Sequence, residues 1–127
     1  MRILLDTHVW LWWLSEPEQL PPRIRQAIEE GSNEILISVA SSWEIAIKYA
    51  LGKLPLPESP ESFVPSRLQR EGFGTLHIQH RHALAVAGLP PHHRDPFDRL
   101  LIAQGQAESI PIATVDSIFE HYDVELI

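Results

Sequence analysis

The sequence predicts an α/β fold with a mostly parallel central sheet that helices cover on both faces. Short apolar stretches rich in β-branched residues alternate along the chain with longer stretches whose apolar residues recur at helical spacing. Parallel strands need crossover connections, so this alternation indicates right-handed helical crossovers that pack on both sides of the sheet. The 127 residues are the length of one domain, and no repeat or linker divides them. We therefore expect a single domain over 1–127.

The first part of the chain predicts a buried strand followed by two helices. Residues 2–5 (RILL) are apolar almost throughout, as in a strand buried on both faces. Residues 8–14 (HVWLWWL) have helical length and an almost entirely apolar surface. Pro21-Pro22 and Gly31 predict the start and the end of the next helix, because proline suits the first helical position and glycine the residue after the last.

The middle of the chain predicts a second strand, a helix and a proline-rich loop. Residues 34–39 (EILISV) are rich in β-branched residues, which favours a strand. Residues 41–51 predict a helix, and the glycine that follows them ends it. Three prolines make 53–60 a loop. Beyond it we expect a helix or a pair of turns, interrupted near Pro65 and ended by Gly72.

The last part of the chain continues the alternation of strands and helices. The expected strands are 75–78, 110–113 and 124–127, and the expected helices are 82–87, 97–108 and 116–121. Asp95-Pro96 supplies the start of the helix at 97–108. Gly105 lies inside that helix, where alanine would favour the helix by about 1 kcal/mol.

Three tryptophans crowd the first helix. Trp10, Trp12 and Trp13 cannot all share the face that points to the core. Either the remaining indole forms an exposed apolar patch for a partner or a second copy, or the loop at 55–60 covers it. The sequence leaves both explanations open.

Composition excludes several kinds of protein. The chain has no cysteine, which excludes disulfides and thiolate metal sites. No apolar run approaches the roughly 20 residues that span a bilayer. The apolar stretch at the start of the sequence is too short for a signal peptide. We therefore expect a cytoplasmic protein without a membrane partner. The net charge of −7 argues against a free-standing nucleic-acid binder, but less against a nuclease whose bound cations offset part of that charge.

Four carboxylates lie where expected strands give way to helices: Asp6, Glu44, Asp98 and Asp116. Asp6 and Asp116 follow strands, whereas Glu44 and Asp98 lie in the first turns of helices. These junctions meet at the carboxyl edge of a parallel sheet, where open α/β sheets bind ligands. Carboxylates gathered there repel one another unless a cation relieves them, and hard oxygen ligands suit Mg²⁺ or Mn²⁺. The sequence therefore predicts a site for divalent metal ions.

Each acid also has an ordinary structural explanation. Ser41-Ser42-Trp43-Glu44 matches a capping box, in which the glutamate binds the start of its own helix. Asp95 is a suitable N-cap before proline, with Asp98 favoured by the helix dipole, and Asp116 suits the start of the short helix after it. Asp6 is hardest to explain in this way, because a lone charge among apolar neighbours is costly.

The histidines predict little metal chemistry. His92-His93 lies in a loop bounded by proline, and adjacent side chains rarely point at one metal ion, so we expect a surface loop. His8 is close enough to Asp6 in sequence to approach the site. Three others lack helical metal-ligand spacing and are expected to be structural or solvated: His77, His80 and His82.

Four motifs, in order along the whole chain, resemble those of PIN-domain proteins and, more narrowly, of VapC-type toxins from type II toxin–antitoxin systems. They are LLDTH at 4–8, SSWEI at 41–45, HRDPFDRLLIAQ at 93–104 and ATVD at 113–116. The resemblance implies a PIN-domain-like three-layer sandwich with an acidic pocket that binds one or two Mg²⁺ or Mn²⁺ ions. It also implies endonucleolytic cleavage of RNA, a homodimer, and a cognate antitoxin protein as a separate chain.

Site residues follow from this resemblance by position. It implies that four acids bind metal and carry catalysis: Asp6, Glu44, Asp98 and Asp116. Asp95 either assists the site or only caps its helix, and Thr7 and Thr114 are accessory hydroxyls. The basic residues nearest to the acids in sequence are candidates to bind RNA: Arg94, Arg99 and Lys48. The two arginines could equally be solvent-exposed partners of acidic neighbours.

The expected reaction is hydrolysis by a metal-activated water molecule, which leaves a 5′-phosphate and does not use the ribose 2′-hydroxyl as nucleophile. Two other α/β classes are excluded, because no lysine follows Lys53, as a receiver domain needs, and Asp6 opens no Asp-x-Asp motif of a dehalogenase-type phosphatase. The alternative is a catalytically silent module of the same fold that binds RNA or protein. The presence of all four acids favours the enzyme.

Overall fold

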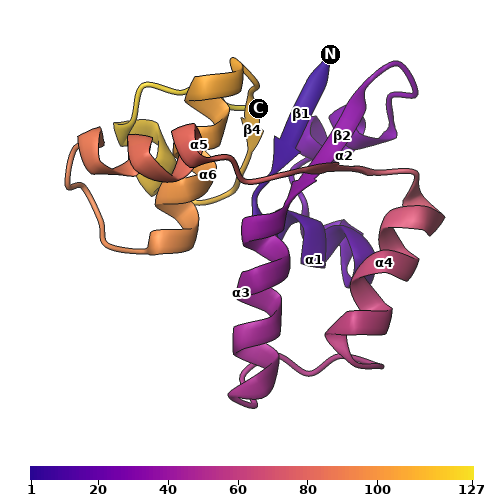
Figure 1. Cartoon of the computed structure of the whole chain (residues 1–127). Helices are drawn as coiled ribbons and strands as arrows, with labels where there is room; N and C mark the ends of the chain where they lie inside the picture. The colour runs from indigo at the N-terminus through magenta and orange to yellow at the C-terminus, as the bar shows by residue number, and fades with distance from the viewer.

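The computed structural model, which describes residues 1–127, has a central sheet of four parallel strands in the order β3-β2-β1-β4 (Figure 1). The strands are β1 (Arg2–Leu5), β2 (Glu34–Ser38), β3 (Gly74–Leu76) and β4 (Ile112–Ala113). Strand β1 lies inside the sheet and pairs with both β2 and β4. The predicted α/β class with a parallel sheet is confirmed.

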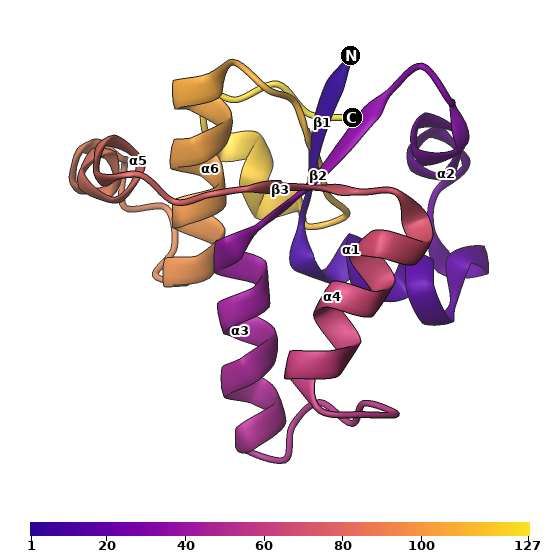
Figure 2. The same ribbon diagram turned by 45° about the vertical axis from the view of Figure 1, so that its right-hand side comes forward.

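Helices connect the strands and cover both faces of the sheet. The α-helices are α1 (Thr7–Ser15), α2 (Pro22–Glu29), α3 (Val39–Ala50), α4 (Pro60–Glu71), α5 (His80–Ala85) and α6 (Pro96–Glu108). The 3₁₀ helices are η1 (Pro17–Gln19), η2 (Val86–Gly88) and η3 (Ser117–His121). Figures 1 and 2 show α5 and α6 on one side of the sheet and α1, α2 and α4 on the other. No helix has the length and apolar character needed to cross a bilayer.

The alternation of side chains along the strands divides the core into two layers. Leu4 of β1 belongs to the layer under α6, where it packs in one cluster with Leu101 and Ile112. Its neighbours Ile3 and Leu5 point to the opposite face and join the cluster built from α1, α2 and Ile45 of α3. The continuous apolar strand at 2–5 thus serves both layers, as the sequence predicts.

The boundary between β2 and α3 differs from the predicted one. Helix α3 begins at Val39, because the Ser38 hydroxyl accepts a hydrogen bond of 3.0 Å from the Ala40 amide and so caps the helix. Ser41 therefore lies inside the helix, and the capping-box explanation of Ser41 and Glu44 is wrong. The Glu44 carboxylate therefore does not cap its own helix.

Helix α4 is continuous, and the predicted interruption near Pro65 is wrong. A proline inside a helix deprives the carbonyl four residues earlier, here that of Glu61, of its partner. Both residues are exposed, so water can bond to that carbonyl at low cost. Gly72 ends the helix in the left-handed conformation, with φ of 71°, as predicted.

The C-terminal strands are shorter than predicted. Strand β4 contains only two residues, and 124–127 contributes a single parallel bridge between Leu126 and Ile112 instead of a strand. Pro111 precedes β4 and has no N–H to donate to a ladder, which limits the pairing. Strand β3 ends at Leu76, and α5 begins at His80, two residues before its predicted start.

The first-helix tryptophans are covered from within the chain. Trp10 is fully buried, and Trp12 and Trp13 pack against the core together with Leu54 and Leu56 of the proline-rich loop. Trp13 Nε1 also donates to Glu71 of α4 at 2.7 Å. None of the three tryptophans is exposed, so the exposed-patch explanation is wrong for these residues.

Helix α6 approaches β4 so closely that a side chain at Gly105 would crowd the side chains of Ile112 and Val124. A Cβ atom built there would lie 2.9 Å from Ile112 Cδ1 and 3.1 Å from Val124 Cγ2. Close packing of the helix on the sheet thus explains a residue that helix propensity disfavours.

We predict that Gly105→Ala lowers the free energy of unfolding. Overpacking costs about 1–3 kcal/mol, which outweighs the gain of about 1 kcal/mol in helix propensity. Urea unfolding of the variant measures the change. Gly31→Ala is the matched control, because a Cβ at Gly31 meets no atom within 4 Å. A Gly105→Ala protein as stable as the parent would contradict the close approach.

Candidate active site

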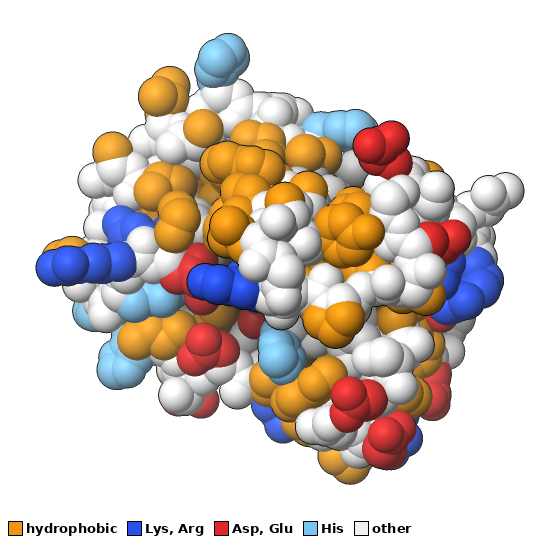
Figure 3. Space-filling view, turned by 90° about the horizontal axis from the view of Figure 1, so that it is seen from below, with side chains coloured by type: hydrophobic (Ala, Val, Ile, Leu, Met, Phe, Trp, Pro, Cys, Tyr) orange, Lys and Arg blue, Asp and Glu red, His pale blue; other side chains and the backbone are white.

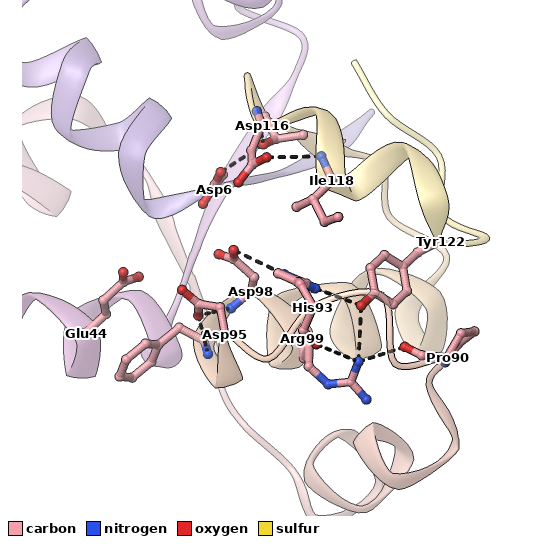
Figure 4. Close-up of polar contacts among 12 residues, drawn as sticks. Asp6, Glu44, Pro90, His93, Asp95, Asp98, Arg99, Asp116, Ile118 and Tyr122 are labelled. Atoms are coloured by element: carbon pink, nitrogen blue, oxygen red, sulfur yellow. Dashed lines mark hydrogen bonds and ion pairs between the residues drawn. The ribbon is translucent and has the colours of Figure 1, made fainter.

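A cleft of about 660 Å³ opens where the carboxyl ends of the central strands meet the following helices. Glu16, the residue after α1, is one of six acids that line it, and the other five are Asp6, Glu44, Asp95, Asp98 and Asp116. They come from the ends of β1 and β4, from α3 and from the start of α6. Figure 4 shows the carboxylates of Asp6 and Asp98 pointing into the same space. The structure thus brings together all four acids that the sequence singles out.

Asp6 ends β1 and is buried, with 5% of its surface exposed. It occupies the N-cap position of α1 but does not cap that helix with its side chain. Its Oδ2 instead accepts a hydrogen bond of 2.8 Å from the Thr114 hydroxyl, whose oxygen also accepts from the Asp116 amide at 3.1 Å. Thr7 donates to Ser41 at 2.7 Å and ties α1 to α3. Thr114 thus connects two acids directly, while Thr7 supports the scaffold.

One carboxylate oxygen of Glu44 accepts a hydrogen bond and the other has no hydrogen-bond partner. Its Oε2 accepts from Lys48 Nζ at 2.5 Å, one helical turn away, and this hydrogen bond raises the pKa of Lys48. Its Oε1 is buried and has no hydrogen-bond partner. Buried polar atoms are rarely left unpaired, so this oxygen is suited to a ligand.

Two of the acids cap helices, as their alternative explanations predicted. Asp95 Oδ1 accepts from the amides of Phe97 at 2.9 Å and Asp98 at 3.0 Å and so opens α6. Asp116 Oδ1 accepts from the Ile118 amide at 3.0 Å. Both also line the cleft, so capping holds each carboxyl group in place without removing it from the site.

Burial and the proximity of other acids raise the pKa values of Asp98 and Asp6. Burial, reinforced by the negative charges of the neighbouring carboxylates, raises the pKa of Asp98 to about 8. Burial also raises the pKa of Asp6 to about 6, against the opposing hydrogen bond from Thr114. Asp98 therefore retains its proton at neutral pH unless a positive charge enters the cleft.

The cleft suits a divalent cation by the chemistry of its donors. All the acids offer hard oxygen ligands, and Glu44 Oε1 lacks any other partner. A cation would also relieve the repulsion that adds to the effect of burial on the pKa of Asp98. As the side chains stand, no three of them converge on one point, so binding would require rotation of carboxylate groups.

His93 contacts the site, which the sequence analysis missed. Its Nε2 lies 3.4 Å from Asp98 Oδ2, and its Nδ1 lies 2.8 Å from the hydroxyl of Tyr122. The surface-loop interpretation holds for the exposed His92 and is wrong for His93. Nothing in the local sequence signals this role, because Tyr122 lies 29 residues further along the chain.

The remaining histidines behave largely as predicted. His82 is buried and contacts Glu108 at 2.9 Å, and this hydrogen bond lowers the pKa of that glutamate. His82 is therefore structural. His8 lines the cleft, and its ring packs edge-on against Trp12 with 4.3 Å between the centroids.

The predicted RNA-binding arginines differ in their surroundings. Arg94 is exposed. Arg99 donates to the Tyr122 hydroxyl and to four carbonyl oxygens, those of Val86, Leu89, Pro90 and His93. These bonds occupy its guanidinium, so the structure corrects the expectation for Arg99, which holds the loop before α6 instead of facing a substrate. Lys48 lines the cleft but is paired with Glu44.

The chain belongs to the PIN domain family, whose sequence model matches residues 3–125. Two curated relatives are ribonucleases VapC from Mycobacterium tuberculosis. Ribonuclease VapC16 is 50% identical over 58 residues, which are 46% of this chain and 41% of that protein. Ribonuclease VapC22 is 30% identical over 115 residues, which are 90% of this chain and 86% of that protein. The predicted family is thereby confirmed.

Solved structures agree on the fold. The structure of VapBC2 from Rickettsia felis, bound to a DNA fragment from their promoter, contains a chain that superposes with a TM-score of 0.74 at 17% identity. The match covers 100% of this chain and 98% of that one. At this identity the likeness concerns the fold.

We predict that the cation-free protein loses stability as the pH rises from about 5 to 8. Asp98 has a folded-state pKa of about 8, above its ordinary value of 3.8, so the folded state binds the proton more tightly than the unfolded state. The resulting stabilisation is present at low pH and is lost as pH rises through the folded pKa. Thermal unfolding in a chelator, at several pH values, measures this slope.

Asp98→Asn should flatten that slope, whereas Asp123→Asn, at an exposed position, should leave it unchanged. Added Mn²⁺ should stabilise the parent protein most at pH 8, where deprotonation costs least. An equal slope in the parent and in Asp98→Asn would contradict the raised pKa.

We predict that Arg99→Ala destabilises the fold, because it leaves several carbonyl oxygens without their charged donor. Hydrogen bonds to charged groups contribute about 1.5–3 kcal/mol, so we expect a loss of at least about 1.5 kcal/mol. Arg94→Ala is the control and should change stability by no more than about 0.5 kcal/mol. Equal stabilities of the two variants in urea unfolding would contradict the role given to Arg99.

Proposed function

We propose that the chain is an endoribonuclease that hydrolyses RNA phosphodiester bonds with one or two divalent cations, Mg²⁺ or Mn²⁺. One observation carries the proposal: four acids from separate elements of the fold line a single cleft. The four proposed ligands are Asp6, Glu44, Asp98 and Asp116. The names of the two ribonuclease relatives support the substrate class.

A divalent cation bound by these carboxylates would activate a water molecule and stabilise charge on the leaving oxygen. The chain's own residues prepare the site for it. Asp98 gives up a proton when the positive charge enters, because its pKa is raised by burial and by its neighbours. Thr114 holds one oxygen of Asp6, and Glu44 offers its unpartnered Oε1. Arg94, exposed just before α6, is the remaining candidate among the two arginines to contact a phosphate group.

We further propose that the protein is the toxin of a toxin–antitoxin pair, inhibited by an antitoxin on a separate chain. The similar fold occurs in the structure of VapBC2 from Rickettsia felis, and this likeness supports such a partner. A homodimer is proposed as well. Trp43 and Tyr49 of α3 and Leu51, which follows the helix, are exposed apolar side chains. Figure 3 shows apolar side chains gathered on the face of the molecule that is seen from below in Figure 1.

The test is cleavage of total cellular RNA by the purified chain with Mn²⁺ or Mg²⁺. Asp6→Asn and Asp98→Asn should each lower the rate by more than about 100-fold, because even outer partners of metal ligands contribute about 10–100-fold. Asp123→Asn, exposed and outside the cleft, is the matched control and should cut like the parent. A chelator should stop the reaction, and the products should carry 5′-phosphates.

Two outcomes would contradict the proposal. Products that end in 2′,3′-cyclic phosphate would show that the ribose hydroxyl is the nucleophile, and chelator-resistant cleavage would exclude the cation. Folded protein that binds Mn²⁺ but cuts no RNA in the pool would instead favour a silent binding module.

A further inference from the structure

A chain of hydrogen bonds leads from Arg99 to the carboxylate of Asp98 (Figure 4). Arg99 Nη1 lies 3.1 Å from the Tyr122 hydroxyl oxygen, which lies 2.8 Å from His93 Nδ1. On the other side of the imidazole ring, His93 Nε2 lies 3.4 Å from Asp98 Oδ2. These hydrogen bonds connect Asp98 and Arg99 of α6 to Tyr122, the residue after η3, and to His93 in the loop before α6.

The chemistry of the groups sets the direction of these bonds. A guanidinium has only N–H donors, so the Tyr122 oxygen accepts from Arg99. The hydroxyl proton of Tyr122 then has one acceptor in the structure, which is His93 Nδ1. A ring nitrogen that accepts carries no proton, so the neutral imidazole holds its proton on Nε2 and donates it to Asp98 Oδ2. When Asp98 is protonated, this arrangement places the acid proton on Oδ1, which leaves Oδ2 as the acceptor.

The groups in this chain are shielded and fixed. The side chains of His93 and Asp98 are only 16% and 15% exposed, and Tyr122 is 5% exposed within the core cluster under α6. The backbone carbonyl of His93 also accepts from Arg99, at 3.4 Å. His93 is therefore held at both its backbone and its ring, and water competes weakly for its hydrogen bonds.

The arrangement at Asp98 parallels the one at Asp6. In each carboxyl group, Oδ2 accepts a hydrogen bond, from Thr114 in one case and from His93 in the other. Each carboxyl group thereby keeps its Oδ1 for the cleft. Both donors fix the orientation of an acid, and the Nε2–H form of the imidazole does so without a positive charge that would compete with a cation.

We propose that His93 is a positioning residue. Tyr122, itself anchored by Arg99, fixes the imidazole as an Nε2–H donor, and this donor orients the Asp98 carboxylate for a divalent cation. The assignment rests on the proposed function only in taking Asp98 as a cation ligand.

The first test is spectroscopic and needs no RNA. A long-range ¹H–¹⁵N correlation spectrum of the full chain identifies which ring nitrogen of each neutral histidine is protonated. His93 should carry its proton on Nε2, with the exposed His92 as an internal reference. Tyr122→Phe keeps the ring but removes the hydroxyl, so it should abolish this preference. A proton on Nδ1 in the parent protein would overturn the proposal.

The second test is Mn²⁺ binding measured by calorimetry. His93→Ala should weaken binding by about 10–100-fold, as expected for partners that orient metal ligands. Tyr122→Phe should weaken it in the same direction, and its conserved ring keeps the fold comparable. His80→Ala, at an exposed position outside the cleft, is the control. Unchanged affinity in His93→Ala, or equal loss in His80→Ala, would overturn the proposal. Thermal unfolding of each variant shows that the compared proteins are folded.

The kinetics of RNA cleavage distinguish the positioning role of His93 from the proposed ribonuclease activity. In RNA cleavage at subsaturating Mn²⁺, His93→Ala should lower kcat and leave KM for RNA unchanged, since His93 touches Asp98 and not the substrate. Mn²⁺ binding that depends on His93 in a chain that cuts no RNA would support the positioning role and contradict the ribonuclease. Cleavage and Mn²⁺ affinity both unaffected by His93→Ala would support the ribonuclease and overturn the positioning role.

Discussion

The burial of several carboxyl groups close together at one edge of the sheet is the constraint on which this structure depends. Asp6 is fixed by the end of β1 and Asp98 by the first turn of α6, so neither can move away from the other without disturbing the core. Burial raises the pKa of Asp6 to about 6 and that of Asp98 to about 8, and the charges of neighbouring carboxylates add to both increases. A fold that holds acids together at this cost is explained most simply by a cation that they share.

Helix α6 positions an acid in the cleft, binds the loop that precedes it and packs closely against β4. Its first turn carries Asp98 into the cleft, and Arg99, the next residue, binds the loop that carries His93. Its far end lies against β4, where Gly105 removes the side chain that would hold the helix away from the sheet. A shift of α6 would therefore change the packing of the core and the position of the acid together.

The sequence predicted the features that depend on local pattern. Alternating strands and helices gave the fold class, and the placement of Asp6 and Asp116 after strands gave the edge of the sheet where the cleft lies. Features that depend on distant contacts were missed: His93 meets Tyr122, 29 residues away, only in the folded chain. The same holds for Pro65, whose tolerance in α4 depends on solvent exposure, which periodicity does not report.

Proton release on Mn²⁺ binding tests the central claim most directly. Isothermal calorimetry at pH 7 in two buffers of different ionisation enthalpy gives the number of protons released. With the pKa of Asp98 at about 8, the site should release close to one proton per chain at pH 7 and fewer at pH 9. Asp98→Asn should remove most of this release. Mn²⁺ binding without proton release, or with a release that Asp98→Asn leaves unchanged, would contradict the claim that the crowded carboxylates are the cation site.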